Sequence, residues 1–271
     1  MKKQEILSKK YALVTGATGG LGKAFAEELA CRGYALVLTG RSEEKLQALQ
    51  ADLQAKYPSL ESIYCPADLT DEKERAKLFQ VIKENAICLS LLANVAGADI
   101  QKGIAEYTQE KIVFQCRVNF EAAVALCKYA IDHKAERLEI VNVSSVSGIY
   151  PMPYFAIYSA TKTALTSFSV SLREEMKGKG VAVTAVLPGA MPTREDIQAQ
   201  IKGQGLWGKL AAKSPSSVAK ASLKAVAKNK SKVIIGFWNK AMRVGTCWIP
   251  SSIRRKFIAR RWSKISKDAF N

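Results

Sequence analysis

Tyr158 and Lys162 stand four residues apart in the segment "YSATK" and carry a phenol and an amine. Side chains four apart on a helix share one face. The same face continues through Leu165, Ser169, Leu172 and Met176. This mostly apolar continuation predicts that the pair points inward, although a lysine at a helix start can instead extend its amine to solvent. An ammonium beside a phenol lowers the pKa of the phenol from its reference near ~10, so the pair predicts a proton donor that works near neutral pH.

A hydroxyl that holds a substrate oxygen would complete such a site. The segment "NVSS", at the end of an apolar run, offers Ser144 and Ser145. The spacing of the residues alone does not choose between them. A serine at a strand end is otherwise an ordinary turn residue.

The stretch "TGATGGLG", residues 15–22, follows the apolar run "YALV" and precedes a helical pattern. In a strand-to-helix turn, amide groups at the helix N-terminus bind phosphate. Gly16 lets the chain turn off the strand, Gly20 removes a side chain where a pyrophosphate approaches, and Gly22 lets the helix pack on the sheet. Thr18 adds a hydroxyl. A glycine turn without a ligand is the alternative, but the position between strand and helix favours nucleotide binding.

Short apolar runs alternate along the chain with helical patterns, and these elements must position the residues above. The runs are continuous, as in parallel strands that are covered on both faces. We expect strands at 11–16, 34–40, 62–69, 87–97, 138–145, 181–189 and 232–237. We expect helices at 21–32, 42–57, 71–85, 108–133, 155–177 and 216–229. The alternation predicts a single α/β domain over residues 1–237, with a Rossmann-type doubly wound parallel sheet of about seven strands and helices on both faces.

Taken in order, these motifs resemble those of the short-chain dehydrogenase/reductase family, in its NADP-preferring type. "TGATGGLG" is similar to the family's TGxxxGxG signature, and "ADL" at 67–69 matches the segment that contacts adenine. "NVAG" at 94–97 resembles the family's NNAG, with Val95 in place of the usual second Asn. "NVSS", "YSATK" and "PGAMPT" complete the set. The resemblance is strong over about residues 10–195, weaker to about 237, and does not reach the tail.

The resemblance implies a catalytic set of Asn119, Ser145, Tyr158 and Lys162. Tyr158 would be the general acid in reduction and the base in oxidation, and Lys162 would also bind the nicotinamide ribose. The family's 13-residue gap to the tyrosine selects Ser145. Asn119, in "RVNF", matches the residue that holds a proton-relaying water. An Asn that satisfies a kink in the helix backbone is the alternative.

The resemblance also implies where the cofactor binds. In dinucleotide folds an acidic residue after the second strand binds the adenosine ribose, whereas an Arg accommodates a 2′-phosphate. Gly40 stands where an NAD enzyme would place its acid, and Arg41 follows, so we expect NADP(H). A solvated surface charge at Arg41 is the alternative. The expected contacts are Gly16, Thr18, Gly20, Leu21, Gly22, Arg41, Ser42, Asp68, Leu69, Asn94, Ala96, Gly97, Tyr158, Lys162, Pro188, Gly189 and Thr193.

The basic residues gather in the last quarter of the chain. Residues 1–200 contain 24 Lys and Arg against 23 Asp and Glu, whereas residues 201–271 contain 17 against a single acid, Asp268. Residues 238–271 form an extension that interleaves aromatic and basic side chains. Three uses stay open for it: contact with an anionic membrane, cover for the substrate pocket or a second subunit, and nucleic acid. The charge lies in the tail rather than on the sheet, which disfavours nucleic acid.

We therefore expect an enzyme that transfers a hydride between NADP(H) and a carbonyl or secondary alcohol. Apolar residues near the expected site favour a lipid-like substrate, such as a 3-oxoacyl group or a steroid. They are Ile149, Pro151, Met152, Tyr154, Phe155, Met191, Leu206 and Trp207, the last three in a loop at about 190–214 that covers the substrate in related enzymes. The alternative is a non-catalytic regulator or scaffold that senses NADP(H), but such proteins tend to lose the Tyr or the Lys.

Composition narrows the remaining classes. Six cysteines without regular spacing are expected to be reduced core thiols of a cytosolic protein. The one histidine, His133, gives no basis for a metal site. The N-terminus lacks an apolar leader, and the uncharged stretches are too short to cross a bilayer. We expect a cytoplasmic protein, peripheral to the inner face of a membrane if the extension binds lipid, and a homo-oligomer as in related enzymes.

Overall fold

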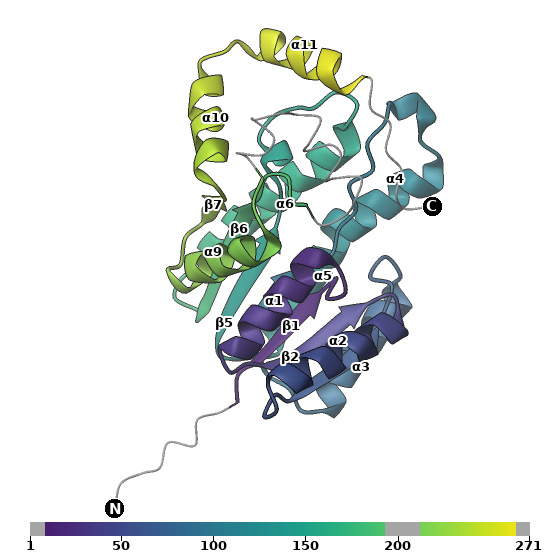
Figure 1. Cartoon of the computed structure of the whole chain (residues 1–271), viewed down its shortest axis with the longest axis vertical. Coiled ribbons are helices and arrows are strands. Elements are labelled where there is room, and N and C mark those ends of the chain that lie inside the picture. Colours follow the sequence, from purple (N-terminus) through teal and green to yellow (C-terminus); the bar gives the residue numbers. More distant parts are fainter. Residues whose placement is uncertain (1–8, 193–211, 264–271) are drawn as a thin grey trace, which may run out of the picture.

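A seven-stranded parallel sheet forms the centre of the molecule in the computed structural model, which describes residues 9–192 and 212–263 (Figure 1). Its strands are β1 (Tyr11–Thr15), β2 (Ala35–Gly40), β3 (Ser62–Pro66), β4 (Leu89–Asn94), β5 (Lys134–Val143), β6 (Val181–Leu187) and β7 (Lys232–Ile234). The order across the sheet is β3-β2-β1-β4-β5-β6-β7, and all neighbouring pairs are parallel. The predicted doubly wound sheet is confirmed.

Helices cover both faces of the sheet, each around its own buried apolar cluster. One face carries α1 (Gly20–Cys31), α2 (Glu43–Lys56) and α9 (Pro215–Ala227). The other carries α3 (Glu72–Glu84), α5 (Ala122–Asp132) and α6 (Ala156–Glu175). The remaining elements are η1 (Ile104–Glu106), α4 (Gln109–Cys116), η2 (Arg117–Glu121), η3 (Val146–Gly148), α10 (Phe237–Cys247) and α11 (Ser251–Trp262). In Figure 1, α10 and α11 arch over one end of the molecule, above α6.

The helix expected at 108–133 is interrupted where Asn119 lies. α4 runs into η2, a π-helical turn, before α5 begins. A π turn inserts an extra residue into the helical ladder, and such turns occur at functional sites. Asn119 is buried in this turn. The pattern of apolar residues predicted a helix here but carried no signal for the insertion.

The strand order reverses between β1 and β4, because β2 and β3 lie on one side of β1 and β5 to β7 lie beyond β4. A crevice forms at such a switch point beside the carboxyl ends of the strands, and ligands bind there. Thr15 ties the two strand ends together. Its Oγ1 accepts hydrogen bonds from the backbone N–H groups of Val95 at 2.9 Å and Ala96 at 3.0 Å.

The composition led to expectations about the cysteines and about membrane-spanning helices. Cys65 and Cys127 are buried as expected, but the expectation of core thiols is wrong for the four exposed cysteines, Cys31, Cys88, Cys116 and Cys247. The four lie at helix ends or in turns, where apolar neighbours in the sequence point elsewhere. Among the described residues, every helix is too short or too polar to span a membrane.

Gly22 fixes how closely α1 approaches the end of β1. A Cβ added at Gly22 would lie 2.1 Å from the carbonyl oxygen of Gly16, which is far inside contact distance. Gly16 itself has φ +59, a left-handed conformation that glycine adopts without strain. These two glycines therefore meet a backbone requirement of the turn before any ligand is considered.

Replacing Gly22 by Ala should lower the free energy of unfolding by about 1–3 kcal/mol, because the methyl group forces the turn and α1 apart. Gly245→Ala is the matched control, since a Cβ there meets nothing within 4 Å. That variant should be neutral or slightly stabilising, as expected for Gly to Ala within a helix. Urea unfolding without nucleotide measures both values, and equal effects in the two variants would contradict this account of the turn.

Candidate active site

A cavity of about 740 Å³ opens at the carboxyl ends of the strands. Most residues predicted to bind cofactor or substrate line it: Gly16, Thr18, Gly20, Leu21, Gly22, Arg41, Asp68, Leu69, Ala96, Gly97, Ser145, Tyr158, Lys162, Pro188 and Gly189. Ser42, Asn94 and Asn119 are not among the lining residues. Thr193, Leu206, Trp207 and most of the expected loop at 190–214 lie outside the described residues.

Lys162 is buried, with only 4% of its surface exposed. Its Nζ donates a hydrogen bond to the carbonyl oxygen of Val143, at the end of β5, at 2.9 Å. The alternative of a lysine that extends to solvent is therefore wrong. Burial lowers the pKa of Lys162 to about 8, against a smaller opposing effect of the Asp99 carboxylate. The amine is thus charged at neutral pH but loses its proton more readily than a surface lysine.

Tyr158 lies beside this amine, on the same face of α6 and at the wall of the cavity. The Nζ of Lys162 is 5.7 Å from the centroid of the Tyr158 ring. Tyr158 also has an aromatic neighbour, Phe155, whose ring stacks on it at 4.3 Å between centroids. The stacking and the helix together fix the direction of the phenol. The predicted pairing of amine and phenol on one inward face is present in the structure.

Gly97 lets the chain after β4 pass close to Lys162 and Asn119. A Cβ on Gly97 would lie 2.9 Å from the Asn119 Oδ1 and 3.2 Å from the Lys162 Nζ. Asn119 holds the next residue, Ala98, by both backbone groups: its Oδ1 accepts from the Ala98 N–H at 2.8 Å and its Nδ2 donates to the Ala98 carbonyl at 2.9 Å. Asn119 therefore bonds to the loop after β4, which differs from the alternative in which it satisfies its own helix.

The two serines of "NVSS" have different surroundings. The Ser144 Oγ donates to the carbonyl oxygen of Lys162 at 2.7 Å and accepts from the Thr166 hydroxyl, so it joins β5 to α6. The Ser145 Oγ accepts from the Ser147 N–H at 3.1 Å, which leaves its own hydroxyl hydrogen for another partner. Ser145 is thus the better placed of the two to hold a substrate oxygen, in agreement with the choice implied by the family's spacing.

Asn94 faces the core rather than the cavity. Its Nδ2 donates to the Asn142 Oδ1 at 2.8 Å, and the Asn142 Nδ2 donates to the Ser169 Oγ at 2.9 Å. This buried chain of polar groups joins β4, β5 and α6. These bonds set how the strands that lead to Gly97 and Ser145 lie against the helix that carries Tyr158.

At the end of the cavity where we expect the adenosine of the cofactor, Arg41 follows β2 and Thr18 lies against the same strand end. A Cβ on Gly40 would lie only 3.4 Å from the Thr18 Oγ1. Ser42 accepts a hydrogen bond from the Lys45 N–H and so caps α2. Serine is a preferred N-cap residue, and the cofactor contact expected for Ser42 stays a prediction.

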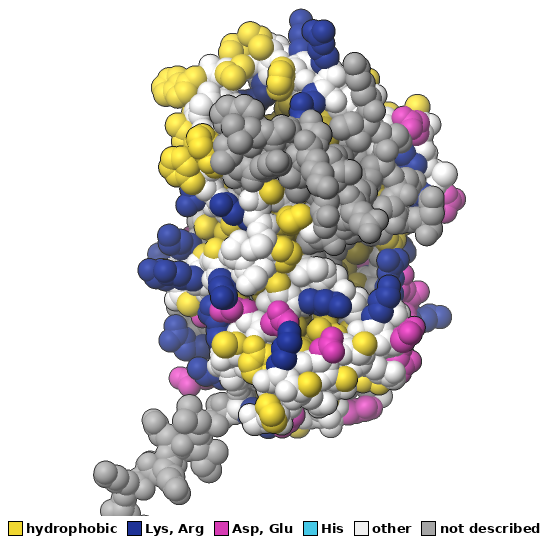
Figure 2. Space-filling view, in the orientation of Figure 1, with side chains coloured by type: hydrophobic (Ala, Val, Ile, Leu, Met, Phe, Trp, Pro, Cys, Tyr) yellow, Lys and Arg dark blue, Asp and Glu magenta, His cyan; other side chains and the backbone are white. Residues whose placement is uncertain are grey.

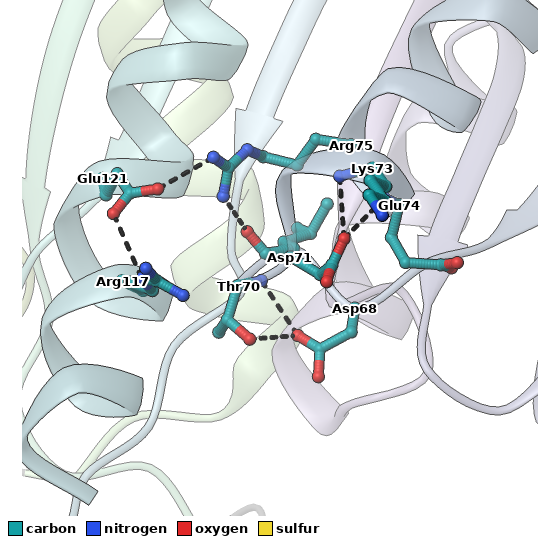
Figure 3. A network of polar contacts seen from close by, with 9 residues as sticks. Asp68, Thr70, Asp71, Lys73, Glu74, Arg75, Arg117 and Glu121 are labelled. Carbon is teal, nitrogen blue, oxygen red and sulfur yellow. Dashed lines mark hydrogen bonds and ion pairs between the residues drawn. The ribbon is translucent and has the colours of Figure 1, made fainter. Parts of the chain in front are cut away.

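A polar network holds the segment after β3, which carries Asp68 and Leu69 (Figure 3). The Asp68 Oδ1 accepts from the N–H and the hydroxyl of Thr70 at 2.9 and 2.8 Å. Arg75, which is buried, donates to the Leu69 carbonyl at 2.7 Å and pairs with the Glu121 carboxylate at 2.8 Å. The pairing links the part of the cavity lined by Asp68 and Leu69 to the turn that contains Asn119. Sequence reasoning missed Arg75, because surface helices carry many arginines.

The described part of the C-terminal extension supplies one wall of the cavity. Asn239, 3% exposed, packs against Gly189, where an added Cβ would lie 2.6 Å from its Nδ2. The guanidinium of Arg254 lies 3.9 Å from the centroid of the Tyr150 ring, and its Nη1 donates to the Thr246 carbonyl at 2.8 Å. Sequence reasoning missed these residues because the family resemblance ends near 237. The remaining wall residues from α10 and α11 are Met242, Arg243, Phe257, Ile258 and Trp262.

The wall is largely apolar on the substrate side. Of the residues predicted to favour a lipid-like substrate, Ile149, Met152, Phe155 and Met191 line the cavity. Tyr154 instead lines a smaller hollow beside Ile104, and Pro151 lines neither space. Within the described ranges, no group of three or more His, Cys, Asp or Glu residues is placed to hold a metal ion.

The comparisons with known proteins agree with this geometry. The sequence profile described as short chain dehydrogenase matches residues 10–202. The very-long-chain 3-oxoacyl-CoA reductase of Bos taurus is 33% identical over 228 residues, which cover 80% of this chain and 68% of that protein. The dehydrogenase/reductase SDR family protein 7-like of Anopheles gambiae is 30% identical over 84% of this chain and 75% of that protein.

A solved structure shows the same fold. The L-sorbose reductase of Gluconobacter frateurii, complexed with NADPH and L-sorbose, superposes with a TM-score of 0.75 at 23% identity, over 84% of this chain and 95% of that one. Together with the fold and the matched profile, these results place the chain: it belongs to the short chain dehydrogenase family. It is an oxidoreductase that transfers a hydride between a nicotinamide cofactor and a carbonyl or alcohol group.

The buried amine makes stability depend on pH in a defined window. Between pH 8 and 10.5 the unfolded chain holds a proton on Lys162 that the folded chain has lost, so the free energy of unfolding rises with pH there. The rise is at most ~3 kcal/mol. Chemical denaturation of the parent and of a Lys162→Met variant at pH 8 and at pH 10.5 tests this. We expect the free energy of unfolding of the parent to rise relative to that of the variant between the two pH values. A constant difference between the two proteins would show that the amine titrates as it does in water.

Proposed function

We propose that this protein is an NADP(H)-dependent reductase or dehydrogenase of a lipid-like carbonyl or alcohol. The observation that carries the proposal is the pair of Tyr158 and buried Lys162 on one cavity wall, with the Ser145 hydroxyl on another. A phenol beside an amine with a lowered pKa suits proton transfer near neutral pH. A fixed hydroxyl beside it suits the orientation of a substrate oxygen.

The residues at the glycine turn fit a dinucleotide. α2 and α3 begin with side-chain caps on their first N–H groups, whereas α1 has Gly19 as its N-cap, with no side-chain cap and no acid in its first turn. Its N-terminus faces the cavity at Gly20 and Leu21. An uncapped helix N-terminus favours an anion such as a pyrophosphate. When bound, the nicotinamide cofactor supplies or accepts the hydride.

The protein's own part in the reaction is position and proton transfer. Ser145 donates to the substrate oxygen and fixes it near Tyr158. Tyr158 gives its proton to that oxygen in reduction and takes it back in oxidation. The positive charge of Lys162 favours the phenolate that remains, and Asn119 holds the loop of Ala98 in place beneath the amine. By resemblance Asn119 also holds a water that returns protons through Lys162.

Arg41 supports NADP(H) over NAD(H). The residue lines the cavity at the end of β2, and its planar guanidinium suits a 2′-phosphate. The preceding position is Gly40, which is buried and lies against Thr18. An acidic side chain that could bind a ribose 2′-hydroxyl is therefore absent from that position.

Arg41→Glu should weaken the binding of NADPH by more than about 10-fold, because a charge-assisted contact is replaced by repulsion. The affinity for NADH should change much less, since NADH lacks the 2′-phosphate. Titration of the intrinsic fluorescence with each nucleotide gives both constants. Unchanged NADPH affinity would remove this assignment while leaving the catalytic pair in place.

The apolar residues of the cavity and the two arginines that α10 and α11 add to its wall indicate the substrate class. Ile149, Met152 and Phe155 form an apolar surface near the catalytic pair, and α10 and α11 add Arg243 and Arg254. A substrate made of an acyl chain and an anionic carrier would place the acyl chain on this apolar surface and the charge of the carrier near the two arginines. The bovine relative is named as a very-long-chain 3-oxoacyl-CoA reductase, which supports a 3-oxoacyl thioester as the first candidate and a ketosteroid as the second.

NADPH oxidation with a panel of 3-oxoacyl thioesters, ketosteroids and small aldehydes tests the function. We expect turnover of at least one apolar ketone, and Tyr158→Phe should lower kcat by about 10²–10⁴-fold because the proton donor is lost. The variant should bind NADPH as the parent does, which controls for folding. A Tyr158→Phe protein as fast as its parent would sink the mechanism. NADPH binding without turnover of any compound would favour the alternative function, a non-catalytic regulator or scaffold that senses NADP(H).

A further inference from the structure

The outer faces of α10 and α11 expose an unusual amount of apolar surface. Ten large apolar side chains in the described part of the chain are prominently exposed, and seven of them lie between residues 237 and 257. Trp248 is 86% exposed, Phe237 73% and Val244 64%. In Figure 2, yellow side chains gather at the end of the molecule that α10 and α11 occupy in Figure 1, with Lys and Arg beside them. Exposed apolar patches of this kind mark interaction sites.

The same two helices carry only positive charge. Residues 237–263 contain seven Lys and Arg and no Asp or Glu. Arg255 and Lys256 are exposed, as are Arg260 and Arg261. The partner that this surface fits must therefore be negatively charged and must also accept apolar and aromatic side chains.

Each helix has an inner face that packs on the body. Asn239, Met242 and Thr246 of α10 face the cavity, as do Arg254, Ile258 and Trp262 of α11. Val244, Trp248, Arg255 and Lys256 do not line it. The exposed residues are thus outer-face residues of helices that are already anchored, so a partner can bind them without unfolding the cavity wall.

We propose that these outer faces form a docking surface for an anionic lipid bilayer, composed of Phe237, Val244, Trp248, Ile253, Arg255 and Lys256. A surface that combines aromatic and aliphatic side chains with lysine and arginine binds the interfacial region of such a bilayer. Tryptophan favours that region because its ring is apolar and its N–H is polar. This proposal does not depend on which carbonyl compound the enzyme reduces.

The docking surface continues into the cavity. Met242 and Phe257 both line the cavity and are 46% and 70% exposed. These two side chains are therefore apolar contacts shared by the docking surface and the cavity. A lipid-like substrate that enters from the membrane would therefore meet apolar side chains at this wall of the cavity.

Charge argues against a second copy of the chain as the occupant. A two-fold contact through this surface would bring the same patch against itself. Arg255 and Lys256 of one copy would then approach the same cations of the other, with no acid in the segment to compensate. An anionic bilayer removes this repulsion, because its head groups supply the negative charge.

Sedimentation with vesicles tests the proposal on the full chain. The parent should pellet with vesicles of phosphatidylcholine mixed with phosphatidylglycerol, and several-fold less with phosphatidylcholine alone or at high salt. Val244→Ser with Trp248→Ser should reduce pelleting several-fold, and so should Arg255→Glu with Lys256→Glu. None of these residues lines the cavity, so turnover of a short, water-soluble substrate should be kept in both variants.

The matched control is Lys177→Glu with Lys179→Glu, which makes the same change of charge in the exposed turn between α6 and β6, at the amino-terminal end of that strand. It should pellet as the parent does. A parent that stays in the supernatant with both vesicle types would overturn the proposal. So would a control that loses binding as fully as Arg255→Glu with Lys256→Glu. A parent dimer in analytical ultracentrifugation that Val244→Ser with Trp248→Ser converts to a monomer, with vesicle binding unchanged, would assign the surface to a second copy.

Discussion

The buried charge of Lys162 is the constraint on which the site depends. A lysine that is 4% exposed must have a hydrogen-bond acceptor, and the Val143 carbonyl at the end of β5 provides it at 2.9 Å. This bond ties α6, which carries Tyr158, to the edge of the sheet where a cofactor binds. Gly97 must then lack a side chain, since a Cβ there would lie 3.2 Å from the amine. The position of the Lys162 amine therefore constrains the positions of α6, of the end of β5 and of the loop that contains Gly97.

The turn at the switch point shows the same dependence of chemistry on backbone packing. Thr15 binds two N–H groups of the loop after β4, and Asn119 binds both backbone groups of Ala98 in that loop. Held from both ends, the loop cannot move away from the amine. The family motifs thus contain residues whose work is to fix loops, alongside those that touch ligand. Asn94 and Ser42 also make supporting bonds, to the core and to a helix end, and their expected contacts with the cofactor stay predictions.

The sheet, its order of elements and the inward face of α6 could be predicted from the sequence, because continuous apolar runs and a four-residue spacing report directly on burial. The π turn around Asn119 could not, because one inserted residue leaves the apolar pattern of a helix almost unchanged. The wall made by α10 and α11 escaped prediction for another reason. Its fit depends on single long-range contacts, such as Asn239 against Gly189 and Arg254 against Tyr150, which no local pattern contains.

The position of that wall after β7 has an evolutionary consequence. The residues expected to handle hydride and proton all precede β7, whereas α10 and α11 come after it and contact the body at residues such as Tyr150 and Phe155. A change confined to this segment can therefore alter the shape of the cavity without altering the residues that precede β7. The range of substrates that enter the cavity can therefore change while the residues expected to act on them stay the same.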